Sequence, residues 1–123
     1  MANKKILVVD DEETTVRLVE KILLSAGYQV ITAMDGLEAL VKIKNEKPHL
    51  VVLDIMMPEV NGYDVCYQLR FNKDFEQVPI VILSSRDQEM ADSIGKRINI
   101  EYLPKPPHTK SLLEKIKSLL SEN

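Results

Sequence analysis

Three short, uninterrupted apolar runs constrain the fold of this chain more than any other feature. Each is rich in β-branched side chains and is followed at once by a polar residue. The runs and the residues that follow them are Ile6–Val9 before Asp10, Leu50–Leu53 before Asp54, and Ile80–Leu83 before Ser84. Strands buried on both faces of a parallel sheet have this pattern, because neither face needs polar side chains. We therefore expect three central strands that carry polar groups at their carboxyl ends.

Segments with helical periodicity separate these strands and two weaker ones, Gln29–Ala33 and Glu101–Leu103. Five helices are expected, and the residues that mark them are Val16, Val19, Ile22, Leu23 and Ala26; Leu37, Leu40, Val41 and Lys44; Val65, Cys66 and Leu69; Met90, Ile94 and Ile98; and Leu112, Leu113, Ile116, Leu119 and Leu120. Gly27 is expected to end the first helix. Asp35 and Glu38 are expected to form a capping box at the start of the second. Regular alternation of strand and helix predicts a mainly parallel sheet with helices on both faces.

Length and composition narrow the class of protein. The chain has 123 residues, near the typical size of one domain, with 45% apolar and 28% charged residues. A net charge of −3 disfavours direct binding of nucleic acid. The single cysteine, Cys66, allows no internal disulfide and is expected to be a buried thiol. No apolar stretch is long enough for a signal peptide or a membrane span, so the cytoplasm is the expected location.

Polar residues at the strand ends predict the position of a site. In an open α/β sheet, ligands bind beyond the carboxyl ends of the strands. That rule brings together Asp10, Asp11, Asp54, Ser84 and Lys105, the last of which follows the fifth strand. Taken singly, each has an ordinary interpretation as a turn, a cap or a surface charge, but their joint placement at four strand ends favours a site.

Chemistry indicates what such a group of residues does. Neighbouring ionised carboxylates repel each other and have raised pKa values unless a cation lies between them. Their hard oxygen atoms suit Mg²⁺. A carboxylate beside that metal is able to attack phosphorus and form an aspartyl phosphate. A hydroxyl and an ammonium then bind the phosphoryl oxygens.

Four segments in order make the chain resemble the receiver domains of response regulators, over almost its whole length. They are Ile6–Glu12 with the acidic pair, Leu50–Pro58 followed by Gly62, Val78–Ser85, and Tyr102–Pro106. The resemblance implies a flavodoxin-like (βα)5 sandwich of three layers, with a five-stranded parallel sheet of order 2-1-3-4-5. A single receiver domain would occupy residues 1–123.

The resemblance also implies a role for each site residue. Asp54 would accept a phosphoryl group from a phosphohistidine of a sensor kinase or phosphotransfer protein. The Mg²⁺ ligands would be Asp10, largely through water, Asp11 more directly, Asp54, and the backbone carbonyl of Met56. Ser84 and Lys105 would bind the phosphoryl oxygens. The chain would not be an enzyme in the usual sense, but would assist its own phosphorylation and dephosphorylation.

A conformational switch follows from the same resemblance. The phosphate would draw Ser84 inward, Tyr102 would turn from an exposed to a buried position, and the face formed by the fourth helix, the fifth strand and the fifth helix would change. The side chains of Met56 and Arg86 are expected to tune the lifetime of the phosphorylated state. The Lys105–Pro106 bond is expected to be cis, which would aim the lysine into the crevice. The Ile98–Glu101 segment departs from the family's usual small residues on this output face.

Alternatives and partners remain open at the level of sequence. An Mg²⁺-dependent aspartyl-phosphate phosphatase usually carries Asp-x-Asp, but Met56 stands two residues after Asp54. A pseudo-receiver that only binds is disfavoured by the intact acids and lysine, and a flavin site by the lack of a loop rich in Ser, Thr or Gly after the first strand. A downstream protein or a fused output domain would receive the signal, and the chain would be a monomer or a weak dimer promoted by phosphorylation.

Overall fold

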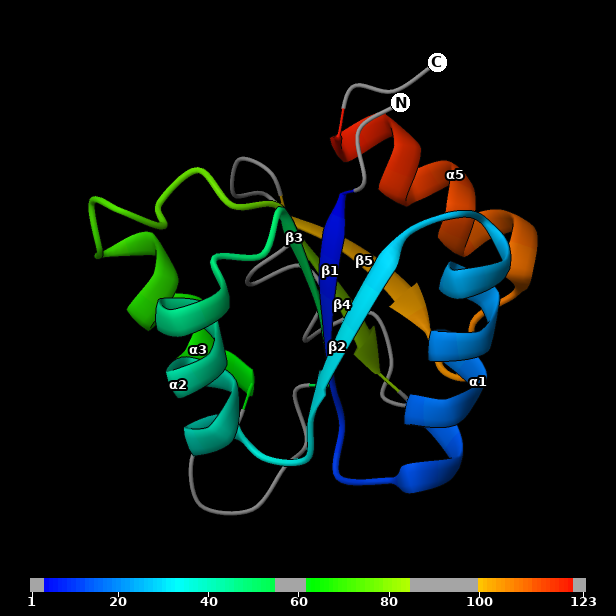
Figure 1. The fold of residues 1–123 in the computed structure, drawn as a ribbon, viewed down its shortest axis with the longest axis horizontal. Helices are drawn as coiled ribbons and strands as arrows, with labels where there is room; N and C mark the ends of the chain where they lie inside the picture. The colour runs from blue at the N-terminus through cyan, green and yellow to red at the C-terminus, as the bar shows by residue number, and fades with distance from the viewer. Residues whose placement is uncertain (1–3, 55–61, 85–99, 121–123) are drawn as a thin grey trace.

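The computed structural model describes residues 4–54, 62–84 and 100–120, and they form a five-stranded parallel sheet between helices (Figure 1). The strands are β1 (Lys5–Val9), β2 (Gln29–Ala33), β3 (Leu50–Asp54), β4 (Ile80–Ser84) and β5 (Ile100–Pro104). Their order is β2-β1-β3-β4-β5. This confirms the parallel sheet and its expected order, and β5 is one residue longer at each end than the sequence predicted.

Burial explains the apolar runs that define the strands. Every residue of β3 and β4 is buried, and in β1 only Lys5 is partly exposed. The edge strands β2 and β5 are only partly buried, which is why their sequences show weaker patterns. The register pairs Val9 with Leu53 and Leu53 with Ile82. The ends of β1, β3 and β4 therefore reach the same edge of the sheet.

Helices cover both faces of the sheet and complete the three layers. Figure 1 shows α1 (Glu13–Ser25) and α5 (Thr109–Leu119) on one face, and α2 (Gly36–Glu46) and α3 (Gly62–Arg70) on the other. Each face has its own apolar core. Ile6, Val8 and Val52 pack with α1 and α5, whereas Leu7, Val9 and Val51 pack with α2 and α3. Alternate residues of one strand thus serve opposite cores, as strand geometry requires.

Two helix ends have the predicted chemistry. Gly27 follows α1 with a φ of 95°, a left-handed conformation that glycine adopts without steric cost. The Asp35 side chain accepts a hydrogen bond of 2.7 Å from the Glu38 backbone N–H and so caps α2. Glu38 accepts in return from the N–H of Met34, at 2.8 Å, rather than from that of Asp35. The cap is therefore confirmed, and its return bond reaches one residue further back than in a standard capping box.

The face that α2 buries differs from the residues that predicted the helix. Its buried residues are Gly36, Ala39 and Ile43. Leu37 and Val41 are instead 55% and 58% exposed. Gly36, Ala39 and the larger Ile43 are three and four residues apart, so they share the one side of the helix that faces the sheet. An apolar surface consequently remains on the outside of α2.

Of the remaining fold predictions, one is confirmed and one concerns residues that the structure does not describe. Cys66 is buried, as expected. The predicted helix marked by Met90, Ile94 and Ile98 lies outside the described residues. Within the described ranges, no helix is long and apolar enough to cross a membrane.

Candidate functional site

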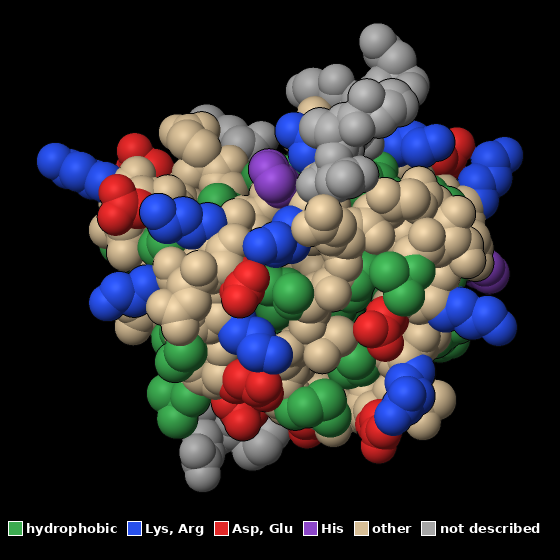
Figure 2. All heavy atoms as spheres, in the orientation of Figure 1, with side chains coloured by type: hydrophobic (Ala, Val, Ile, Leu, Met, Phe, Trp, Pro, Cys, Tyr) green, Lys and Arg blue, Asp and Glu red, His purple; other side chains and the backbone are tan. Residues whose placement is uncertain are grey.

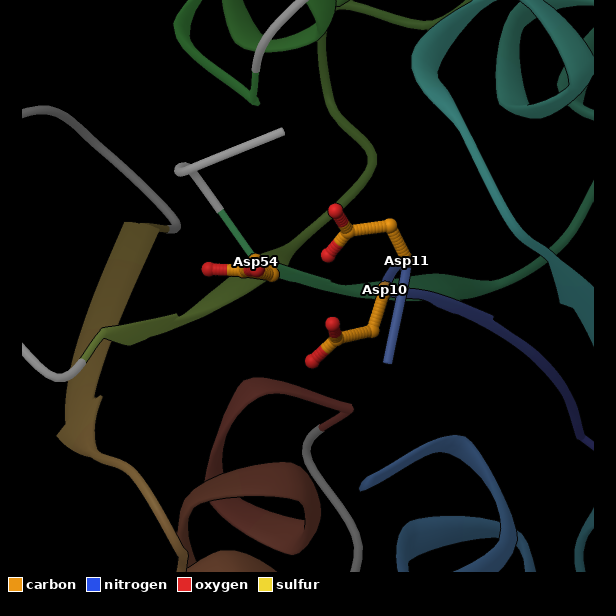
Figure 3. A group of neighbouring side chains, drawn as sticks. All are labelled: Asp10, Asp11 and Asp54. Carbon is orange, nitrogen blue, oxygen red and sulfur yellow. The ribbon is translucent and has the colours of Figure 1, made fainter. Parts of the chain in front are cut away.

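Three carboxylates meet at the carboxyl ends of β1 and β3. One oxygen atom from each of Asp10, Asp11 and Asp54 lies within 4.8 Å of the other two. Figure 3 shows Asp10 and Asp11 at the end of β1, with Asp54 beside them at the end of β3. Asp10 and Asp54 are 1% and 3% exposed, whereas Asp11 is open to solvent. The predicted acidic cluster is therefore formed, with one side accessible from outside.

Asp10 is held in place by the backbone that follows it. Its Oδ1 accepts a hydrogen bond of 2.9 Å from the Glu12 N–H. Its Oδ2 is buried and has no hydrogen-bond partner among the described residues, although Nζ of Lys105 lies 2.9 Å away as an ion pair. Burial raises the pKa of Asp10, the charge of Asp54 adds to the rise, and the contacts with Glu12 and Lys105 only partly oppose it. A buried acceptor with spare capacity is what a cation would satisfy.

Lys105 enters the same crevice from the end of β5. The Lys105–Pro106 bond is cis, as predicted, and the Lys105 N–H donates a hydrogen bond of 3.0 Å to the carbonyl of Ser84. Its ammonium pairs with Glu12, with Asp10 at 2.9 Å and with Asp54 at 3.5 Å. Burial acts to lower the pKa of Lys105, but the contacts with Glu12 and Asp10 outweigh it and raise that pKa above its usual value. The ammonium is therefore firmly charged.

Ser84 and Tyr102 lie on the adjacent strands β4 and β5. Ser84 is the last residue of β4 and is 1% exposed, so its hydroxyl belongs to the buried end of the sheet. Tyr102 is opposite Ile82 in the register and is partly buried against the α2–α3 side of the core. Its hydroxyl is buried and makes no hydrogen bond within the described part of the chain. An unsatisfied buried hydroxyl is costly, so among the described residues only packing holds Tyr102 in this conformation.

The structure also extends and limits the predicted set of site residues. Met56 and Arg86, the two predicted tuning residues, lie outside the described residues. Glu12 was not predicted as a site residue, yet its carboxylate pairs with the Lys105 ammonium. In the sequence, the only signal for Glu12 was the uninterrupted acidic run that begins at Asp10. Its contact with Lys105 could not be predicted, because the two residues are far apart in the chain and meet only in the folded sheet.

The chemistry of the donors fits a hard divalent cation. Three carboxylates offer oxygen ligands within the span of one ion, and one of them is open to water. Among the described residues, Lys105 brings the one positive charge to a site that also faces Glu12, so the balance of these charges is negative. A phosphoryl group could be held between a divalent ion and the Lys105 ammonium, within reach of the Asp54 carboxylate.

Comparison with known proteins gives the same family throughout. The family model of the response regulator receiver domain matches residues 6–117. The chain is 44% identical over 119 residues to the alkaline phosphatase synthesis transcriptional regulatory protein PhoP of Bacillus subtilis (strain 168), covering 96% of this chain and 49% of that protein. It is 38% identical to protein PilG of Pseudomonas aeruginosa over 115 residues, which are 93% of this chain and 85% of that protein.

Solved structures agree with the fold. The chemotaxis protein CheY4 of Vibrio cholerae superposes with a TM-score of 0.87 at 29% identity, covering 96% of this chain and 99% of that one. A CheY-like response regulator receiver domain protein from Methanospirillum hungatei JF-1 gives a TM-score of 0.87 at 28% identity, over 98% and 95% of the two chains. The chain spans about half the length of curated relatives such as the Bacillus protein.

Proposed function

This chain belongs to the response regulator receiver family, and on that premise we propose that it is a two-component signalling switch whose Asp54 carboxylate accepts a phosphoryl group. One observation carries the proposal. The Asp54 carboxylate lies within 4.8 Å of the Asp10 and Asp11 carboxylates and 3.5 Å from the ammonium of Lys105. The donor would be a phosphohistidine of a sensor kinase or of a phosphotransfer protein.

The transfer is a nucleophilic displacement at phosphorus. A carboxylate oxygen of Asp54 forms the new P–O bond while the P–N bond to the donor imidazole breaks, and the imidazole keeps that electron pair and takes up a proton. The negative charge that builds on the phosphoryl oxygens is stabilised by the Lys105 ammonium, which the site already holds in position. The Ser84 hydroxyl, at the end of the next strand, donates to another phosphoryl oxygen.

Asp10, Asp11 and Asp54 are the side chains that would hold Mg²⁺, together with the predicted Met56 carbonyl. When bound, the ion supplies positive charge to the phosphoryl oxygens and relieves the repulsion among the carboxylates. The buried Oδ2 of Asp10 supports this assignment, because among the described residues it makes no hydrogen bond and pairs with the Lys105 ammonium alone. The same machinery would later admit a water molecule and so let the protein assist its own dephosphorylation.

Ser84 and Tyr102 would pass the change to the surface. A phosphoryl group on Asp54 draws the Ser84 hydroxyl toward it, which alters the space beside Tyr102 on the neighbouring strand. The Tyr102 hydroxyl has no hydrogen-bond partner within the described residues, so turning it costs packing but no hydrogen bond. The Bacillus relative is a transcriptional regulatory protein of about twice this length, and a fused or separate output module is the proposed recipient of the signal.

Intact-protein mass spectrometry tests the acceptor directly. With Mg²⁺ and acetyl phosphate, the wild-type protein should gain one phosphoryl mass, and Asp54→Asn should gain none. Removing Mg²⁺ with EDTA should abolish the gain. An unmodified wild-type protein would favour the pseudo-receiver alternative, and an equal gain in Asp54→Asn would show that another residue is the acceptor.

A further inference from the structure

A pocket lies at the opposite end of the sheet from the carboxylate site. It has a volume of about 780 Å³ and is enclosed by α2, α3 and the segment between α3 and β4. Two of its lining residues, Pro48 and Val78, each lie two residues before the start of a strand, β3 and β4 respectively. Phosphoryl chemistry at Asp54 therefore makes no use of this pocket. A volume of this size is typical of ligand sites in proteins.

The walls of the pocket differ in charge. Apolar side chains line part of it, among them Leu40, Phe75 and Val78, and polar side chains line it to a similar extent. Lys44, from the last turn of α2, and Lys47, the residue that caps that helix, form a basic wall. Throughout the described ranges, no carboxylate lies within ion-pair distance of either lysine, whereas Lys5, Lys42 and Lys115 all have such partners. Two ammonium groups without a carboxylate partner in the described ranges, beside apolar side chains, suit an anionic ligand that also has an apolar part.

Exposed apolar side chains lie on and beside the helices that line the pocket. Leu37 and Val41 are on the outer side of α2, next to Leu40 and Lys44. Phe71, which is 81% exposed, directly precedes the pocket residue Asn72. Figure 2 shows hydrophobic and basic side chains close together over the part of the molecule where Figure 1 places α2. Large exposed apolar side chains near a pocket are typical of a surface that binds another protein.

We propose that this α2–α3 pocket binds a peptide segment of a partner protein, in which a bulky apolar side chain enters the pocket and neighbouring acidic side chains pair with Lys44 and Lys47. A nucleic acid is disfavoured, because Asp74 on the opposite wall would repel a phosphate backbone. Asp74 also fixes the orientation of the peptide, since its acidic side chains must face α2. The exposed apolar residues Leu37, Val41 and Phe71 offer further contact area that a small molecule in the pocket would leave uncovered.

Synthetic peptides test the proposal without knowledge of the natural partner. The probes are capped hexapeptides with Leu or Phe at the centre and Glu on each side, titrated into the ¹⁵N-labelled protein and followed by amide chemical shifts. Saturable shifts should occur in the segments 40–48 and 68–78, and not at Asp10 or Asp54. Matched peptides with Lys in place of Glu, or Ser in place of the apolar residue, should bind at least tenfold more weakly.

Variants of the protein separate charge recognition from general stickiness. Lys44→Glu combined with Lys47→Asn should weaken binding of the Glu peptides about tenfold, which corresponds to about 1.4 kcal/mol. Asn is chosen at Lys47 because the backbone there has a φ of 49°, which Asn tolerates. Lys110→Glu with Lys117→Asn makes the same change of charge on exposed positions of α5 and should leave binding unchanged. Asp74→Asn should strengthen binding by removing a repulsive charge.

Three outcomes would overturn the proposal. The first is the absence of saturable shifts in the pocket segments with any acidic peptide. The second is equal binding of Lys and Glu peptides, or equal binding by the two double variants. The third is a set of pocket shifts that depends on protein concentration without peptide, which would make a second copy of the chain the occupant. Phosphorylation by acetyl phosphate should proceed alike in all these variants, so failure here leaves the proposed function intact.

Discussion

Replacing Lys105 by Met should destabilise the protein through charge, because the two side chains are similar in length. The Lys105 side chain is only 11% exposed, and its ammonium lies 2.9 Å from the Asp10 carboxylate and 3.5 Å from that of Asp54. At the effective dielectric constant of about 20 that suits protein sites, a charge pair at this distance attracts by about 5 kcal/mol. The cost of burying the ammonium offsets much of that attraction. We expect a net loss of about 2 kcal/mol in the free energy of unfolding.

Urea unfolding followed by circular dichroism at pH 7, with EDTA present, measures this loss. The pKa of Lys105 is raised above 10.5, so its stabilising charge is fully present below pH 10.5 and disappears only as the pH rises through the raised value. A measurement at pH 7 therefore captures the whole effect. Lys110→Met, on the exposed surface of α5, is the control and should change stability by less than about 0.5 kcal/mol.

The Asp10→Asn background tests the electrostatic explanation. In an Asp10→Asn background, Lys105→Met should cost less than half as much, because the ammonium has lost its closest buried partner. Mg²⁺ should restore part of the loss in the Lys105→Met protein, since a divalent ion supplies charge at the same place. An equal cost in both backgrounds would refute the electrostatic explanation and assign the effect to packing of the lysine stem.

Three further predictions concern the same site. Mg²⁺ at ten times its Kd should stabilise the wild type by about 1.4 kcal/mol, seen as a rise in Tm of about 5 °C for a chain of 123 residues. Asp11→Asn should remove most of that rise, and equal shifts in both proteins would exclude Asp11 as a ligand. Burial raises the pKa of Asp10 above 3.8, so on acidification Asp10 takes up its proton at a higher pH in the folded state than in the unfolded state. At neutral pH the ionised form of Asp10 therefore lowers the stability of the folded state. Without Mg²⁺, Asp10→Asn should therefore be more stable than the wild type at pH 7, with a difference that shrinks as the pH falls toward 3.8; a constant difference in urea unfolding would contradict this. Ser84→Ala should still be phosphorylated by acetyl phosphate, but the ring signals of Tyr102 in ¹³C-labelled protein should no longer shift on phosphorylation, and an undiminished shift would remove Ser84 from the switch.

Local pattern was enough for the parts of the fold that depend on burial. A strand enclosed on both faces has no place for a polar side chain, so Leu50–Leu53 and Ile80–Leu83 could be recognised without a structure. The buried face of α2 could not be recognised in this way. Leu37 and Val41 indicate a helix correctly, but which side of it meets the sheet depends on the separation of the two layers.

The sequence by itself determined which chemical groups stand at the ends of the central strands, because each of the three buried runs stops at a polar residue. Only the tertiary structure decided how these groups meet. The strand order places β1 beside β3, which brings Asp10 and Asp54 together from opposite parts of the chain. It also brings Lys105 to Glu12 and leaves Lys44 and Lys47 unpaired among the described residues. Distances of a few ångströms control charge interactions, and such distances are set by packing of the whole sheet rather than by neighbours in sequence.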